Sequence, residues 1–162
     1  MNLQEMGWSE HFDQPFKEHQ TRGGLAGRIF VQHRDLYHLM TPDGEIQGIV
    51  TGRFRHEAGS PADFPAVGDW VVYHPSEIDG PVAIQAVLPR RSAFSRLAAG
   101  TVPYEQIIAT NIDTLFIVSG LDDNHSVRRV ERYVTQGWES GAVPVVLLNK
   151  IDVCQIGRAS CR

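Results

Sequence analysis

The sequence predicts a small β-barrel of the OB-fold type, followed by the first strand-helix-strand part of an α/β domain. Five short runs rich in Val, Ile and Tyr, separated by turn residues, fall within residues 24–89, and this pattern is typical of a small closed or nearly closed barrel. An SH3-like barrel would show much the same pattern. Past residue 100, two continuous apolar runs flank a segment of helical periodicity, which is typical of a parallel βαβ unit.

The composition indicates a soluble globular chain. Its 162 residues are 42% hydrophobic, enough for one medium domain or two small ones, and the net charge of −4 argues against a uniformly basic surface that coats nucleic acid. The sequence has no signal-peptide pattern and no apolar run of about 20 residues, so we expect a cytoplasmic protein without membrane contact. Cys154 and Cys161 lie close to the end and the histidines lack ligand spacing, so we expect no disulfide framework and no metal site.

Residues 1–23 are predicted to form an N-terminal arm. Apolar side chains at Leu3, Trp8, Phe12 and Phe16 stand among polar residues, which indicates either a short amphipathic helix or an arm that packs on a neighbour. Pro15 falls inside this pattern and argues against a long regular helix.

The barrel is predicted over residues 24–89. Its five strands are expected at "GRIFVQH", "DLYHLMT", "EIQGIVTGRF", "DWVVYH" and "VAIQAVL". The stretch "TPDGE" has Pro, Asp and Gly in the order of a tight hairpin turn, and "PSEIDGP" is expected to close a second hairpin.

Residues 90–100, within "PRRSAFSRLAAG", are predicted to be a basic linker, and residues 101–154 the start of a second domain. In that domain "TLFIVSGLD" is expected to be a strand buried on both faces. A helix follows, with Ser126 as its N-cap and Gly141 at its end. Its apolar face is expected to carry Val127, Val130, Val134 and Trp138.

Polar residues follow the second apolar run, "VPVVLL", where ligands bind in parallel α/β sheets. A carboxylate at Asp152 can accept both the N1–H and the exocyclic amine of guanine, whereas adenine offers no matching pair of donors. The stem of Lys150 can lie along the purine, and Asn149 can tether the loop. The alternative is that these polar residues simply end a buried strand.

Several segments resemble the ribosome small-subunit-dependent GTPase A family, a bacterial group of circularly permuted GTPases. These segments are "PAVGDWVV", "AVLPRRSAFSR", "IIATNIDTLFIVSGLD" and "RRVERYVTQGWESGAVPVVLLNKID". The resemblance covers about residues 24–154, with Thr110 and Ile112 where members commonly have Ala and Val. It implies an N-terminal OB-fold, then a permuted P-loop-type GTPase domain whose guanine-specificity motif precedes the phosphate loop, then a zinc-binding domain.

The resemblance also implies a function and a set of ligands. Asn149, Lys150, Ile151 and Asp152 would form the guanine-specificity motif and bind GTP or GDP. The protein would hydrolyse GTP during late maturation of the small ribosomal subunit, with the subunit and its rRNA as partners, and we expect a monomer. Mg²⁺ and a structural zinc are implied only for the family's C-terminal part.

A phosphate loop is absent from this sequence, because neither lysine follows a glycine and no D-x-x-G motif occurs. We therefore expect the domain to be truncated, the loop to be encoded downstream, and this chain to be inactive as a GTPase. Residues 155–162 are expected to be a non-native tail. The resemblance ends at Cys154, and "IGRASCR" back-translates to a sequence that resembles a common sequencing adapter.

Five arginines are candidates for RNA contact, since guanidinium groups pair with phosphates and stack on bases. They are Arg53, Arg55, Arg90, Arg91 and Arg96. Exposed arginines are also common on barrels that bind no RNA. Two functions remain open: the N-terminal portion of a GTP hydrolase that acts on the small subunit, and a non-enzymatic OB-fold module that binds RNA or oligosaccharide.

Overall fold

The computed structural model describes residues 1–75, 80–98, 104–123 and 125–153. Most of the turn predicted at "PSEIDGP" and the tail predicted at residues 155–162 lie outside the described residues. The chain forms two compact units, residues 1–112 and residues 113–162, and each is described by itself. No helix of the described residues is long and apolar enough to cross a membrane.

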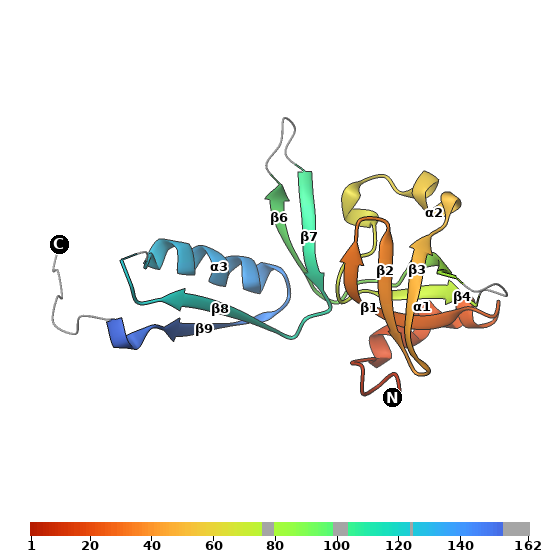
Figure 1. The fold of residues 1–162 in the computed structure, drawn as a ribbon, viewed down its shortest axis with the longest axis horizontal. Coiled ribbons are helices and arrows are strands. Elements are labelled where there is room, and N and C mark those ends of the chain that lie inside the picture. Colours follow the sequence, from red (N-terminus) through yellow and green to blue (C-terminus); the bar gives the residue numbers. More distant parts are fainter. Residues whose placement is uncertain (76–79, 99–103, 124, 154–162) are drawn as a thin grey trace. The chain divides into compact units, whose positions relative to one another are not determined.

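Five strands of the first unit close into a barrel in the order β1-β2-β3-β5-β4 (Figure 1). They are β1 Leu25–His33, β2 Leu36–Thr41, β3 Gly44–Val50, β4 Trp70–His74 and β5 Val82–Val87. Only the β3–β5 pair is parallel, as the Greek-key barrel of an OB-fold requires. The predicted five-stranded barrel is therefore confirmed, including the hairpin at "TPDGE", where Thr41 pairs with Gly44.

The barrel core is built from inward-facing side chains of alternate strand positions. Leu39 lies at its centre with none of its surface exposed, and Ile29, Tyr37 and Ile84 pack around it. A Cβ on Gly48 would come within 2.9 Å of Leu39 Cδ1. The neighbouring strand therefore needs glycine at that position for Leu39 to fit.

The third strand is shorter than predicted, because the chain turns into a helix after Val50. Thr51 has extended backbone, and its Oγ1 accepts a hydrogen bond of 3.1 Å from the Phe54 N–H, so Thr51 is an N-cap. Helix α2 then runs over Gly52–Glu57, and the short helix η1 over Pro61–Asp63. The stretch "TGRF" therefore starts a helix and does not extend the strand.

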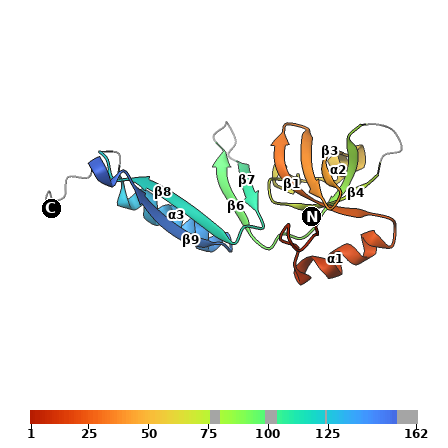
Figure 2. The same cartoon turned by 60° about the horizontal axis from the view of Figure 1, so that its bottom comes forward.

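Helix α1, Glu10–Gln20, packs on the barrel (Figures 1 and 2). Phe12 and Phe16 are buried in a second core cluster together with Trp70 of β4. The Trp8 ring lies edge-on to Trp70 with 4.8 Å between ring centroids. Of the two alternatives for the N-terminal arm, the structure has the amphipathic helix, which buries its aromatic side chains against its own barrel.

The segment predicted to be a basic linker forms a strand instead. β6, Ala93–Ala98, pairs antiparallel with β7, Tyr104–Thr110. Strand pairing depends on a partner segment, and the small and basic residues of the first strand gave no sign of that partner. The end of β7 is held to the barrel by a 2.9 Å bond from the Thr110 N–H to Val67 O. This close approach requires Gly68, since a Cβ there would lie 2.0 Å from Thr110 O.

The second unit is a parallel βαβ arrangement, as predicted. It consists of β8 Thr114–Gly120, α3 Val127–Glu139, β9 Val143–Asn149 and the short helix η2 Ile151–Val153. The predicted N-cap is confirmed, because the Ser126 Oγ accepts from the Arg129 N–H. Gly137 lets α3 approach the strands, since a Cβ there would come within 2.9 Å of Pro144.

Two predictions of burial in this unit are wrong. β8 is not buried on both faces, because Phe116 and Val118 are 62% and 64% exposed. Trp138 and Val127 were expected on the covered face of the helix, but each is more than half exposed. Among the described residues of this unit α3 covers one face of the sheet (Figure 1), and its buried residue is Gly137.

Candidate functional site

The first candidate site lies at the carboxyl ends of β8 and β9. Asn149 is the last residue of β9, and its Oδ1 accepts a 2.8 Å hydrogen bond from the backbone N–H of Lys150. Lys150 has a φ of 60°, in the left-handed region that a non-glycine residue rarely adopts. The Asn149 side chain thus stabilises the sharp turn that directs the next residues away from the sheet.

The Lys150 ammonium forms an ion pair with Asp122, with 2.5 Å between Nζ and Oδ2. Asp122 follows β8 in the chain as Lys150 follows β9, so the pair joins the two strand ends. Asp122 was not predicted to be a site residue. Its position two residues after an apolar strand was the signal that could have identified this contact.

Asp152 and Ile151 lie on η2, beyond the end of β9. Both side chains are exposed, and Ile151 is 72% exposed. Within the described part of the chain, Asp152 has no hydrogen-bond or ion-pair partner. Its carboxylate is therefore available to accept two hydrogen bonds from one ligand edge.

A cavity of about 380 Å³ is lined by Asn149 and Lys150, whereas Ile151 and Asp152 do not line it. Ser119 and Gly120 of β8 line it from one strand, and Asn149 and Lys150 from the other. Helix α3 also lines the cavity, through Arg129, Val130 and Tyr133. These three residues were not predicted as site residues. The cavity thus combines a basic group, an aromatic ring and the polar strand ends.

Arg90, a candidate for RNA contact, is engaged within the barrel. Its Nε and Nη2 donate to the two carboxylate oxygens of Asp69 at 2.9 and 2.7 Å, and Asp69 is fully buried. Its Nη1 and Nη2 also donate to the carbonyl oxygens of Ala62 and Phe64. These four hydrogen bonds favour a structural role for Arg90, which clamps the segment after α2 to β4.

The other candidate arginines of the first unit do not form one cluster. Arg53 is 84% exposed and bonds Glu57 through Nε, which raises the pKa of Arg53. Arg55 pairs with Asp35, and Arg96 Nε donates to Gln106 Oε1. Arg91 is exposed, and its backbone N–H donates to Asn111 Oδ1.

A second cavity, of about 370 Å³, lies between the barrel and β7. Of the five arginines predicted to contact RNA, only Arg55 lines this cavity. Arg96 lies next to it, because it bonds the lining residue Gln106. The glutamine and tyrosine side chains of this cavity, Gln32, Tyr37, Tyr104 and Gln106, were not predicted. They lie on three different strands, so their spacing in the sequence does not indicate a common site. Across residues 1–75, 80–98, 104–123 and 125–153, no three His, Cys, Asp or Glu side chains lie close enough to hold a metal ion.

Two solved structures share the fold of this chain. The crystal structure of YloQ, a circularly permuted GTPase, matches 82% of this chain and 42% of its own, with a TM-score of 0.58 and 19% identity. The crystal structure of YjeQ from Thermotoga maritima matches 80% of this chain with a TM-score of 0.60 and 20% identity. The barrel and the strands and helix after it therefore have the fold of the N-terminal part of the circularly permuted GTPases.

Sequence comparison identifies the family. Residues 87–160 match the model of the RsgA GTPase family, a range that extends past Cys154, where we expected the resemblance to end. The small ribosomal subunit biogenesis GTPase RsgA 2 of Lactiplantibacillus plantarum is 50% identical over 132 residues, which are 82% of this chain and 37% of that protein. RsgA of Opitutus terrae is 40% identical over 161 residues, or 94% of this chain and 44% of that protein. The chain belongs to the RsgA GTPase family and spans about two fifths of the length of these relatives.

Proposed function

We propose that this chain is the guanine-recognising and RNA-docking portion of a GTP hydrolase that acts in late maturation of the small ribosomal subunit. The observation that carries the proposal is the Asn-Lys-Ile-Asp sequence at the carboxyl end of β9, with an unpartnered carboxylate at Asp152. The names of the relatives support the ribosomal role, since they are small ribosomal subunit biogenesis GTPases.

Guanine recognition is proposed to depend on four residues with different tasks. The Asp152 carboxylate accepts the N1–H and the exocyclic amine of the base, while the stem of Lys150 packs against the purine. The side chain of Asn149 stabilises the turn at Lys150, and Ile151 sets the spacing between Lys150 and Asp152. Phosphoryl transfer needs donors around the phosphates and Mg²⁺, which these residues do not supply.

RNA docking is proposed for the first unit, through exposed arginines on α2 and on the β6–β7 hairpin. Arg53, Arg55, Arg91 and Arg96 can each approach phosphate oxygens, because they lie at the surface. Arg90 contributes indirectly, by holding the surface segment between α2 and β4 in place. Each phosphate contact should add to the salt dependence of binding.

The test of guanine recognition uses a chimera. Residues 1–152 replace the matching part of the Lactiplantibacillus plantarum relative, which supplies the remainder of that protein. The substitution Asp152→Asn should weaken GTP binding in a titration by roughly tenfold to a hundredfold, because a charged acceptor of two hydrogen bonds is lost. Xanthosine triphosphate, which presents an acceptor in place of the amine, should regain part of the affinity.

The matched control is Asp123→Asn, which removes an exposed carboxylate close to Asp122 in the same unit. GTP affinity should be unchanged in this control. A chimera in which Asp152→Asn binds GTP as tightly as the parent would show that Asp152 does not contact the base.

A further inference from the structure

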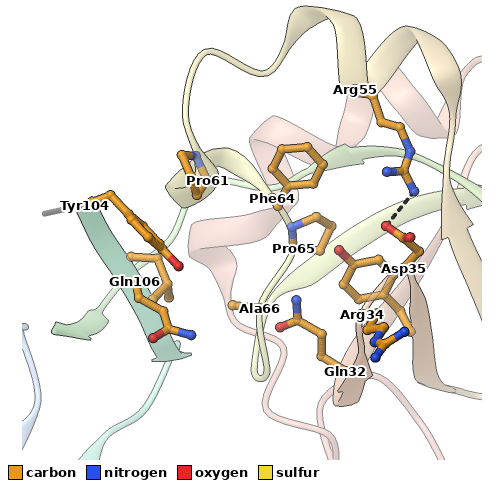
Figure 3. Close-up of a pocket in the computed structure, with 12 residues that line it drawn as sticks. Gln32, Arg34, Asp35, Arg55, Pro61, Phe64, Pro65, Ala66, Tyr104 and Gln106 are labelled. Carbon is orange, nitrogen blue, oxygen red and sulfur yellow. Dashed lines mark hydrogen bonds and ion pairs between the residues drawn. The ribbon is translucent and has the colours of Figure 1, made fainter. Parts of the chain in front are cut away.

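The cavity of about 370 Å³ between the barrel and β7 is assembled from separate parts of the first unit. Its volume is at the small end of the roughly 300–1,000 Å³ typical of ligand sites. Figure 3 shows Tyr104 on one side of it, Gln32 and Arg34 on the other, and Phe64 with Pro65 between them. It therefore combines flat apolar surfaces with amide groups and a guanidinium.

One polar group of this cavity has no hydrogen-bond partner among the described residues. Tyr37 of β2 is 2% exposed and lines the cavity, yet among the described residues nothing forms a hydrogen bond with its hydroxyl. Burial raises the pKa of Tyr37, so the hydroxyl stays protonated at neutral pH and can donate. Because this hydroxyl is not among the buried atoms that lack a partner, it is accessible from the cavity and can bond solvent or a ligand there.

The walls of the cavity are fixed by contacts outside it. Arg90 holds the carbonyl oxygens of Ala62 and Phe64 at 2.7 and 2.9 Å, so the Phe64 wall is anchored to buried Asp69. The strand that carries Tyr104 is held to the barrel where Thr110 bonds Val67. The Phe64 wall of the cavity is thus preformed, as is common in ligand sites.

The charged residues of the cavity are mainly basic. Arg34 follows β1 with a φ of 50°, and in the part of the chain that the structure describes its guanidinium has no hydrogen-bond or ion-pair partner. Arg55 lies nearby and is paired with Asp35 at 2.9 Å. A free guanidinium beside a flat, partly apolar cavity suits a ligand that has a planar ring and an adjacent phosphate.

We infer that this cavity accepts one unpaired nucleobase of an RNA strand. The base stacks on the Tyr104 ring, which is 45% exposed, and its edge bonds the Tyr37 hydroxyl and the amides of Gln32 and Gln106. Arg34 binds the adjoining phosphate. The inference rests on the proposed RNA docking and narrows it to single-stranded RNA.

The test measures the affinity of the whole chain for three fluorescent probes by anisotropy. The probes are a short unstructured RNA strand, its duplex with the complementary strand, and a strand of equal length built of abasic ribose phosphates. The unstructured strand should bind more tightly than both others. Tyr104→Ala should weaken its binding by roughly 5- to 150-fold, the range seen when a stacking aromatic is removed, and leave abasic binding unchanged.

Conservative variants separate recognition from folding. Tyr104→Phe keeps the stacking ring and should bind as the parent does, whereas Tyr37→Phe removes only the hydroxyl and should weaken binding of the unstructured strand several-fold. Ile108→Ala is the matched control, since Ile108 is 41% exposed on the same strand but does not line the cavity. It should leave all three affinities unchanged.

The outcomes distinguish this inference from the proposed RNA docking. If Tyr104→Ala binds the unstructured strand as the parent does, or if the abasic strand binds equally well, the cavity does not hold a base. RNA docking would survive that result if replacing Arg53, Arg91 and Arg96 with Ala still reduced the salt dependence of RNA binding. If the parent chain binds none of the three probes, both the docking and the base site are wrong.

Discussion

The barrel and the βαβ unit have similarly apolar strands, yet only the barrel buries them. In the barrel, Leu39, Val71 and Ile84 have no exposed surface. In the second unit, Phe116, Val118 and Leu148 are each more than half exposed. Closure makes the difference, because every strand of a closed barrel has two neighbours and one enclosed face.

A two-stranded sheet covered by one helix cannot do the same. β8 and β9 each have one paired edge within the unit, and α3 covers one face. Sheets of two strands are marginally stable in water without further packing. Apolar sequence therefore predicts that a strand will form but not that it will be buried, which depends on how many elements surround it.

The largest expected effect compares one apolar side chain from each unit. Leu39→Ala should lower the free energy of unfolding of the barrel by about 3–5 kcal/mol, in the upper part of the range for such truncations, since the glycine beside it cannot fill the cavity. Phe116→Ala should change stability by less than about 0.5 kcal/mol, because the ring is mostly exposed already. Denaturant unfolding followed by tryptophan fluorescence measures both.

For Leu39→Ala, a Trp138→Phe background makes the signal specific to the first unit, which holds the other two tryptophans, Trp8 and Trp70. Phe116→Ala is followed through Trp138, which lies in the second unit. Phe116→Ala should also increase solubility, as it removes part of an exposed apolar surface. A loss of several kcal/mol in Phe116→Ala would mean that this face is covered in solution, and the contrast between the units would be wrong.

An intermediate effect is expected from the buried ion pair of the barrel. Asp69→Asn removes the charge that binds Arg90 and should lower the free energy of unfolding by about 3 kcal/mol. This value is at the low end for a broken buried ion pair, because the Arg90 side chain is 19% exposed. Glu57→Gln breaks the exposed pair with Arg53 and should give no measurable change. Equal effects of the two substitutions would mean that the Asp69–Arg90 pair does not clamp the segment before β4.

The fold could be predicted where local pattern decides it. Alternating apolar residues and turn chemistry located all five barrel strands, and the caps located α3. The strand β6 was missed because it follows two arginines and half of its residues are Ala or Ser, and only its pairing with β7 identifies it as a strand. The structure divides the chain after Ile112, whereas we placed the second domain from residue 101. Composition does not reveal the bonds that join the end of β7 to residues 67 and 68, which are remote in sequence.

The candidate site was predictable in part for the same reason. Asn149, Lys150 and Asp152 are contiguous, so their spacing carried the signal. Asp122 is remote in sequence and meets Lys150 only because β8 and β9 are parallel and in register. Arg90 could not be distinguished from Arg91 by sequence, since only the fold reveals which of two neighbouring arginines faces a buried carboxylate.

The smallest expected effect compares the two helix caps, Thr51 of α2 and Ser126 of α3. Thr51→Ala should destabilise the barrel by about 1 kcal/mol, since the Phe54 N–H loses its partner, while Thr51→Ser keeps the hydroxyl and most of the stability. Ser126→Ala should also cost up to about 1 kcal/mol, because its bond to the Arg129 N–H is long, at 3.4 Å. That cost should appear only in the fluorescence of Trp138 and leave the transition followed through Trp8 and Trp70 in place. If Ser126→Ala shifts the barrel transition as well, the two units unfold together, and the stability of the barrel depends on the open sheet that follows it.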